Sequence, residues 1–146
     1  MHLNGTFTFN APLQTVWDVL LGPETISRCM PGCEQFDQIG PDEFQASMKI
    51  GIGPVKGTYS GKIKLADQQP PTSYRMEVQG GGGPGHVTGV GVMTLKEDGG
   101  KVIVSYQGDA QVTGKIASVG QRLLTPIAKQ MINQFFKCME GKIGDR

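Results

Sequence analysis

The feature that most constrains this chain is a long amphipathic pattern near its C-terminal end, between residues 115 and 142. Apolar residues recur there every three or four positions, which places them on one face of an α-helix, and polar residues occupy the other face. The apolar positions are Ile116, Val119, Leu123, Leu124, Ile127, Ala128, Met131, Ile132, Phe135, Phe136 and Met139. The residues before this helix must supply a large apolar surface for it to cover. Pro126 predicts a kink or a division near Thr125, and Gly141 and Gly144 predict the end of the helix.

The preceding residues alternate between apolar and polar positions, as β-strands do when one face is buried. The predicted strands are 3–10, 36–39, 43–52, 55–66, 72–79, 87–96 and 101–113, and two short helices are predicted at 13–21 and 23–28. The glycine-rich segment 80–85 is predicted to be a flexible connector. We therefore expect a single α+β domain over residues 1–146, with a seven-stranded curved antiparallel sheet around one long C-terminal helix and two short helices after the first strand.

The composition excludes several classes of protein. Fourteen Lys and Arg residues against thirteen Asp and Glu leave the chain almost neutral, and no basic run occurs, so no nucleic-acid partner is expected. We find no secretion signal and no apolar run of about 18 residues, which favours a cytoplasmic protein. Cys29, Cys33 and Cys138 are too few and too unevenly spaced for a disulfide framework or a metal knuckle. We expect packed or partly exposed cysteines and no metal.

The sequence contains no recognisable catalytic arrangement. His2 and His86 have no matched Ser, Asp or Glu partners, so we expect no catalytic residues. Gly80, Gly82 and Gly85 match the spacing of a dinucleotide-binding fingerprint, but a strand follows them instead of the helix that would hold a pyrophosphate. General acid–base chemistry therefore has no support in the sequence.

Large flexible side chains and glycines share the inward positions of the predicted sheet. The inward candidates for an apolar ligand site are Met48, Tyr59, Met76, Met93 and Tyr106 from the strands and Leu124, Ile127 and Met131 from the long helix. Among them lie the glycines Gly57, Gly61, Gly89, Gly91 and Gly108. Methionine adapts to irregular apolar shapes, and each glycine removes volume. These positions fit either an apolar cavity or an ordinary core under a bent sheet.

Two glycine-rich loops are expected at one end of the sheet, beside the start of the long helix. The gate loops, as we call them, contain Gly53, Pro54, Gly83, Pro84, Gly85 and His86. Glycine permits the backbone changes that opening and closing would need. His86 is expected at the mouth, either as a hydrogen-bond donor to a ligand carbonyl or as an ordinary exposed histidine. At the other end, Phe135, Phe136 and Met139 are expected to dock the helix on Trp17 and Leu20.

Several segments resemble a known family. They are Trp17 to Leu21, Pro23-Glu24-Thr25, Met30-Pro31-Gly32-Cys33-Glu34, the Gly-Pro-Val-Lys-Gly segment at 53–57, Gly83-Pro84-Gly85 and 109–115. With the order of elements, they resemble the CoxG family of carbon monoxide dehydrogenase subunits, in the START-like, Bet v 1-like (SRPBCC) superfamily. This resemblance implies a helix-grip fold and a non-enzymatic accessory protein of CO dehydrogenase-type molybdenum hydroxylases. It also implies a cavity for a quinone or similar isoprenoid, and a link from the enzyme to the membrane quinone pool.

The resemblance favours a soluble binding protein with no covalent cofactor, whose apolar pocket takes a quinone or lipid-like molecule. A long isoprenoid would exceed a pocket of roughly 300–1,000 Å³, so we expect a buried ring and a tail along the gate. Some family members carry a C-terminal anchor, whereas this chain ends at Arg146, so any contact with the inner face of the membrane is expected to be peripheral and transient. One alternative is a docking and recruitment module without a ligand. Another is a small hydrolase or cyclase that uses Tyr59, Tyr106 or His86.

Overall fold

The computed structural model describes residues 1–144 and has the predicted order of elements. The strands are β1 His2–Phe9, β2 Cys33–Gly40, β3 Glu43–Ile50, β4 Gly57–Gln69, β5 Ser73–Gly82, β6 Gly85–Asp98 and β7 Lys101–Thr113. The helices are α1 Leu13–Leu21, α2 Pro23–Cys29 and α3 Gln121–Gly144, with 3₁₀ turns η1 Gly53–Val55 and η2 Lys115–Val119. The predicted α+β class, the seven strands and the long C-terminal helix are thus confirmed.

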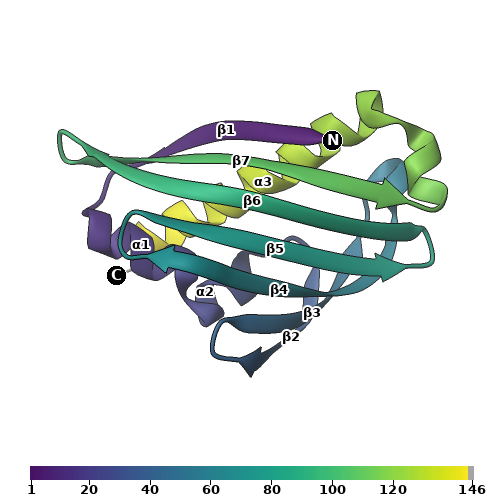
Figure 1. The fold of residues 1–146 in the computed structure, drawn as a ribbon, viewed down its shortest axis with the longest axis horizontal. Helices are drawn as coiled ribbons and strands as arrows, with labels where there is room; N and C mark the ends of the chain where they lie inside the picture. The colour runs from purple at the N-terminus through teal and green to yellow at the C-terminus, as the bar shows by residue number, and fades with distance from the viewer. Residues whose placement is uncertain (145–146) are drawn as a thin grey trace.

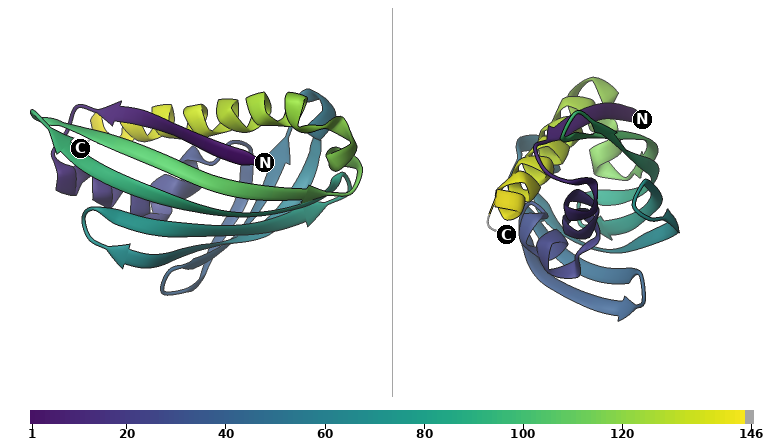
Figure 2. Two further views of the ribbon diagram at one scale, coloured as in Figure 1. Left: turned by 45° about the horizontal axis from the view of Figure 1, so that its top comes forward. Right: turned by 90° about the vertical axis from the view of Figure 1, so that its left-hand side faces the viewer.

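All seven strands form one antiparallel sheet in the order β1-β7-β6-β5-β4-β3-β2. The first strand pairs with the last, and the other strands follow one another through hairpins (Figure 1). The sheet curves around α3 and the two short helices, so that one of its faces is concave (Figure 2). We call this the inner face and the opposite one the outer face.

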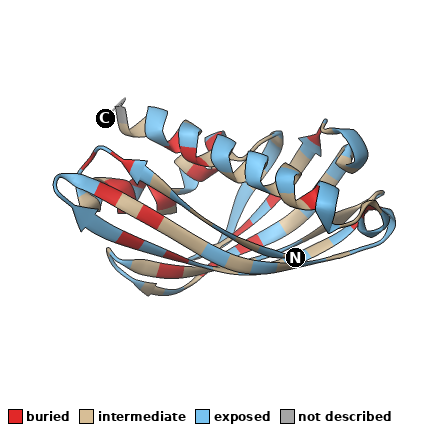
Figure 3. Ribbon diagram, turned by 90° about the horizontal axis from the view of Figure 1, so that it is seen from above, coloured by how far each residue is buried: buried red, intermediate tan, exposed pale blue. Residues whose placement is uncertain are grey.

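The tightly packed core occupies one half of the inner face, beside α1. Val16 and Leu20 of α1, Phe9 of β1, and Phe136 and Met139 of α3 are almost completely buried there. Burial of apolar side chains contributes about 1.5–3 kcal/mol for each, and this cluster is the main source of stability. Phe136 and Met139 lie in one buried cluster with Trp17 and Leu20, as predicted, although the Phe136 ring itself packs on Phe7 and Phe9 of β1. Phe135 is only partly buried. Figure 3 shows the buried residues gathering at this end.

The C-terminal helix differs in detail from its prediction. The structure divides the pattern at Gly120, between η2 and α3, and the α-helix then continues through Pro126 without ending at Thr125. Gly120 has a φ of 88°, a left-handed conformation that favours glycine, and this residue redirects the chain. Pro126 lies in the second turn of α3, where a missing N–H removes one backbone hydrogen bond. The helix also passes through Gly141 and reaches Gly144.

Strand boundaries also differ around the glycine-rich segment. The predicted flexible connector 80–85 is instead the end of β5, a tight turn at residues 83 and 84, and the start of β6. Gly80 pairs with Val87, and Gly82 pairs with Gly85, so the sheet extends further than the glycine content suggested. Cross-strand hydrogen bonds here outweigh the low strand propensity of glycine.

Two of the three cysteines form a disulfide, which the sequence analysis did not predict. Cys29 at the end of α2 and Cys138 in α3 have Cα atoms 5.4 Å apart and are bonded. The expectation of unpaired cysteines is therefore wrong for this pair, because a separation of 109 residues gives no indication of spatial proximity. Cys33 is free and partly buried, and desolvation raises the pKa of its thiol.

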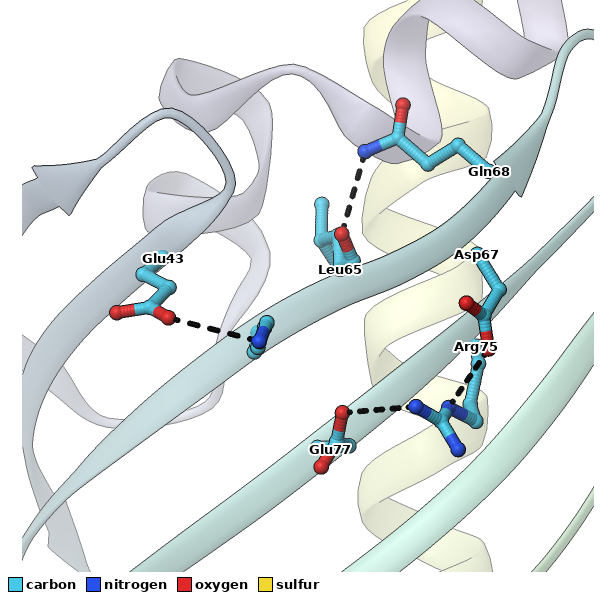
Figure 4. A network of polar contacts seen from close by, with 7 residues as sticks. Glu43, Leu65, Asp67, Gln68, Arg75 and Glu77 are labelled. Atoms are coloured by element: carbon cyan, nitrogen blue, oxygen red, sulfur yellow. Dashed lines mark hydrogen bonds and ion pairs between the residues drawn. The ribbon is translucent and has the colours of Figure 1, made fainter.

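The outer face is mainly polar and carries exposed ion pairs. Arg75 of β5 contacts the carboxylates of Asp67 and Glu77, and Lys64 of β4 lies 3.9 Å from Glu43 of β3 (Figure 4). Such exposed pairs contribute little to stability, about 0–1 kcal/mol each. The outer face is therefore the solvent side of the sheet, and most apolar side chains, Val90 and Val92 excepted, face the helices.

Candidate functional site

Five inward-facing glycines cover part of the inner face away from the packed core. We call Gly61, Gly80, Gly89, Gly91 and Gly108 the glycine floor. Directly opposite residues on paired strands share a face of the sheet. Gly61 pairs with Gly80 and Gly91 pairs with Gly108, while Gly89 lies between residues 78 and 110. The floor therefore forms a band across β4, β5, β6 and β7 on which no side chain stands.

Several side chains bordering the glycine floor are half-buried or exposed, although they point inward. Val78 is 38% exposed, whereas its cross-strand partner Ile63, on the same face, is 8% exposed. Of the predicted strand positions, Met48, Tyr59, Met76 and Tyr106 are also half-buried, and Met93 is buried. We call the floor and these bordering residues the glycine half. The protein's own side chains leave part of this apolar surface open.

The first half of α3 spans the glycine half. The helical tail begins where the Ile116 N–H donates to the Pro84 carbonyl, 2.8 Å away, at the glycine-rich end of the sheet. It reaches the packed core at Phe136, whose ring stacks on Phe7 at 5.4 Å between ring centres. In between, Ile127 and Met131 are half-buried, and Leu124 is buried. The glycine half of the sheet and the first half of α3 are thus two apolar surfaces that face each other, and neither is completely buried.

The gate loops lie together at one end of the sheet, as expected. A Cβ atom at Gly57 would lie 2.6 Å from Cγ of Pro84, so the 83–84 turn packs directly against the start of β4. Residues Gly53 and Pro54 form the exposed turn η1 just before that strand. Opening and closing of these loops stays a prediction.

His86 does not point toward the inner face. It pairs with Gly81, and its ring lies across that glycine on the outer face, where the side chain is exposed. In this arrangement the ring cannot reach a ligand that lies under α3. The register reveals this orientation, because Val87, the next residue, takes the inward position opposite Gly80.

The polar groups of the glycine half are tyrosine hydroxyls. The Tyr59 hydroxyl donates to the Val55 carbonyl at 2.7 Å, and the Tyr106 ring lies over Gly5 of β1. Partial burial raises the pKa of both tyrosines, so both remain neutral near pH 7. The inward positions of the glycine half carry no charged residue. This surface can bind an uncharged apolar molecule, but it offers no acid–base pair for catalysis.

Sequence reasoning misses several members of the glycine half. The glycine-rich pattern places Gly80 in a loop, and nothing in it marks Val78 as a site residue. A signal is nevertheless present, because the alternation of Val78, Gly80 and Gly82 continues the inward positions of Tyr74 and Met76. The glycine content of the segment conceals this period of two.

Other features of the described residues do not suggest a site of different chemistry. A hollow of about 720 Å³ lies between residues 10–12 and the turn between β6 and β7, and nearly all the residues that line it are exposed. A second hollow lies on the outer face. Within residues 1–144, no group of three or more His, Cys, Asp or Glu side chains is placed to hold a metal ion. No helix of the described part is both long and apolar enough to cross a membrane.

A curved seven-stranded antiparallel sheet, gripping one long C-terminal helix over an apolar inner face, defines the START-like, helix-grip class. Solved structures of this class share the fold. A START superfamily protein from Mycobacterium smegmatis has a TM-score of 0.76 and 10% identity, with 99% of this chain and 97% of that chain covered. The Bet v 1-like protein Ara h 8.0201 has a TM-score of 0.72 and 15% identity, with coverages of 100% and 99%.

Within this class, the chain belongs to the CoxG family of carbon monoxide dehydrogenase subunits, whose model matches residues 5–144. A conserved protein from Geobacillus kaustophilus is 36% identical, with a TM-score of 0.96 and coverages of 99% of this chain and 96% of that chain. A search of the curated proteins gave no match. The family resemblance inferred from the sequence is confirmed.

Proposed function

We propose that this chain is a non-enzymatic accessory protein of a CO dehydrogenase-type molybdenum hydroxylase, and that it binds an isoprenoid quinone or a similar apolar molecule between the glycine half and α3. The family supports the enzyme partner. The proposal of a ligand rests on the partial exposure of inward apolar residues, of which Val78, whose exposed fraction is 38%, is the clearest example. A molecule lying on the glycine floor would complete their burial.

The physical basis is the hydrophobic effect acting on an unfilled surface. Each 100 Å² of apolar surface removed from water contributes about 2.5 kcal/mol to binding, before the entropic cost of association is subtracted. A flat ring suits a floor of glycines, because no side chain rises from it, and Met48, Met76 and Met131 can adapt to the ring's outline. The isoprenoid tail would leave along the gate loops.

Side chains introduced on the glycine floor test whether a ligand binds there. A Cβ at Gly89 or Gly91 would meet neighbouring atoms at ordinary distances of 3.4 Å or more, so these positions accept a side chain without moving the backbone. We expect Gly89→Leu and Gly91→Leu to fold but to lose binding of short-tailed ubiquinone and menaquinone, measured by thermal shift and by titration. Gly141→Leu adds the same side chain where no atom lies within 4 Å, and should bind as the wild type does.

Native ligand is sought by extracting the purified protein with organic solvent and analysing the extract by mass spectrometry. A quinone or other isoprenoid in the wild-type extract, absent from the Gly91→Leu extract, supports the proposal. A clean extract together with no thermal shift from either quinone contradicts it. Unchanged quinone binding by both leucine variants would place any ligand elsewhere.

We further propose that the protein meets the membrane through the end that carries the gate loops. The sequence has no Asp or Glu from 44 to 66 or from 110 to 139, and Lys56, Lys115 and Arg122 are exposed there. Leu123, at the start of α3, is 56% exposed. Basic and apolar side chains together favour an anionic lipid surface. Co-sedimentation with phosphatidylglycerol vesicles should decrease for Lys115→Glu and Leu123→Ser. Lys101→Glu, at the start of β7 and beside the turn between β6 and β7, serves as a charge-matched control.

A second candidate function is a docking module that contacts the enzyme without carrying a ligand. Exposed Val90 and Val92 on the outer face of β6 favour this reading. It predicts that a purified CO dehydrogenase-type enzyme captures the wild type and the Gly91→Leu variant equally, while neither binds quinone.

A further inference from the structure

The Tyr74 hydroxyl is a buried polar atom without a hydrogen-bond partner among the described residues. Tyr74 is 1% exposed, and no donor or acceptor within residues 1–144 contacts its oxygen. Arg75 Nε also lacks a hydrogen bond, but it lies 3.2 Å from the Asp67 carboxylate and is therefore compensated. Buried hydroxyl groups are normally hydrogen-bonded, because desolvation without a partner is unfavourable. The Tyr74 oxygen therefore requires an explanation.

Tyr74 lies where the packed core meets the glycine half. On the inner face, Met93 lies directly opposite it across the strand pair, and the next inward residue along β5 is half-buried Met76, which pairs with Gly91. The Tyr74 ring meets the Trp17 ring edge to face, with centroids 5.6 Å apart. The rigid core thus holds the aromatic ring in place, and the residues between it and the glycine floor are flexible methionines.

We propose that the Tyr74 hydroxyl donates a hydrogen bond to a neutral oxygen acceptor, such as a ring carbonyl, at the leading end of the ligand. This inference rests on the proposed function, because the ligand enters over the glycine floor. Unbranched Met76 and Met93 can move aside to admit the ring. With no charged residue at the inward positions of the glycine half, a carboxylate would be buried without a counter-charge, which is strongly unfavourable. The site would therefore select quinones, ketones or esters over fatty acids and hydrocarbons.

The test compares two probes in the wild type and in Tyr74→Phe. The probes are a short-tailed ubiquinone and an isoprenoid hydrocarbon of the same chain length. Loss of one hydrogen bond is expected to weaken quinone binding by about 5- to 30-fold and to leave hydrocarbon binding unchanged. Thr94→Val, which removes an exposed hydroxyl from the outer face next to Met93, should bind both probes as the wild type does.

Stability of the ligand-free protein gives a second readout. If the hydroxyl has no partner before binding, Tyr74→Phe should unfold at the same or a higher temperature than the wild type. A lower unfolding temperature would mean that the fold itself uses the hydroxyl, and would overturn the proposal. Equal quinone affinity of wild type and Tyr74→Phe would also overturn it while leaving the proposed function intact. A wild type that binds neither probe would refute both.

Discussion

At the scale of single residues, the glycines of the floor are not equivalent. A Cβ at Gly108 would lie 2.6 Å from the Val90 carbonyl oxygen, and one at Gly61 would collide with the Gln79 carbonyl. At Gly89 and Gly91 the nearest atoms leave ordinary contact distances. The first pair is required by the close approach of neighbouring strands, whereas the second pair only leaves space. Space that the fold does not require is available to a ligand.

Alanine substitutions should separate these two roles. We expect Gly108→Ala to destabilise the protein by about 1–3 kcal/mol, because a methyl group there must displace backbone atoms. Gly91→Ala should change stability little or raise it by about 0.4–1 kcal/mol through reduced freedom of the unfolded chain. Urea denaturation of both variants measures the difference. Equal effects would contradict the assignment of distinct roles.

Tyr74 should also make the protein sensitive to alkali. Burial raises the pKa of Tyr74 above its ordinary value of 10.0. In the unfolded state the phenol ionises above about pH 10, whereas in the folded state it stays protonated, so the unfolded state binds fewer protons. Stability is therefore complete below about pH 10 and should fall by about 1.4 kcal/mol for each pH unit above it.

Thermal unfolding of the wild type and Tyr74→Phe between about pH 9 and about pH 11 checks this dependence. The variant should lose less stability over that range. The remaining slope is expected to come partly from Tyr59 and Tyr106, whose pKa values burial also raises. Parallel curves for the two proteins would show that Tyr74 does not contribute.

At the scale of elements, α3 is secured at one end and less closely packed at the other. Its second half carries buried Phe136 and Met139 and the disulfide from Cys138 to Cys29 of α2. Its first half carries half-buried Ile127 and Met131 and follows the break at Gly120. A helix held in this way can change its distance from the sheet at the gate end while its other end stays in place.

Removing the disulfide should weaken the secured end. For two cysteines separated by 109 residues, cross-linking of the unfolded chain predicts a loss of about 2–5 kcal/mol in Cys29→Ala/Cys138→Ala. Urea denaturation of the wild type with dithiothreitol should approach the double variant's stability. Cys33→Ala should retain a dithiothreitol-sensitive transition, since Cys33 lies outside the disulfide. No response of the wild type to reductant would contradict a stabilising bond.

At the scale of the whole molecule, the fold consists of a packed half and a glycine half under one helix. The packed half determines the stability of the fold. The glycine half leaves apolar surface open, which lowers that stability. This separation lets a ligand bind while most of the core, apart from Met93 at its edge, stays in place. It also predicts that binding stabilises one half much more than the other.

Hydrogen exchange along α3 tests this division. Without ligand, amides at 122–125 and 127–131 should exchange faster than those at 134–142, because the side chains of the first group are less buried. Short-tailed ubiquinone should slow exchange in the first group and leave the second nearly unchanged. Uniform protection along the whole helix would show that the ligand acts on the entire fold.

The sequence predicted the order of elements well, because alternation and helical spacing are local signals. Lys101–Thr113 and Leu13–Leu21 match their predicted bounds, and the inward orientation of Met48, Tyr59 and Met76 follows from a period of two. It failed at residues 80–85, where glycine suggested a loop and strand pairing decided otherwise. It also failed for the C-terminal helix, where Pro126 predicted a kink or division near Thr125. Pro126 instead lies inside α3, and the division is at Gly120, between η2 and α3.

Local patterning in the sequence was enough to determine a sheet with one apolar face and a helix to cover it, because burial of apolar surface requires both. Only the tertiary structure decided which inward residues remain half-exposed, that Cys29 meets Cys138, and that His86 turns to the outer face. It also decided that the Tyr74 hydroxyl lies without a partner among the described residues. These features depend on distances between strands and helices far apart in the chain, and no local pattern encodes such distances.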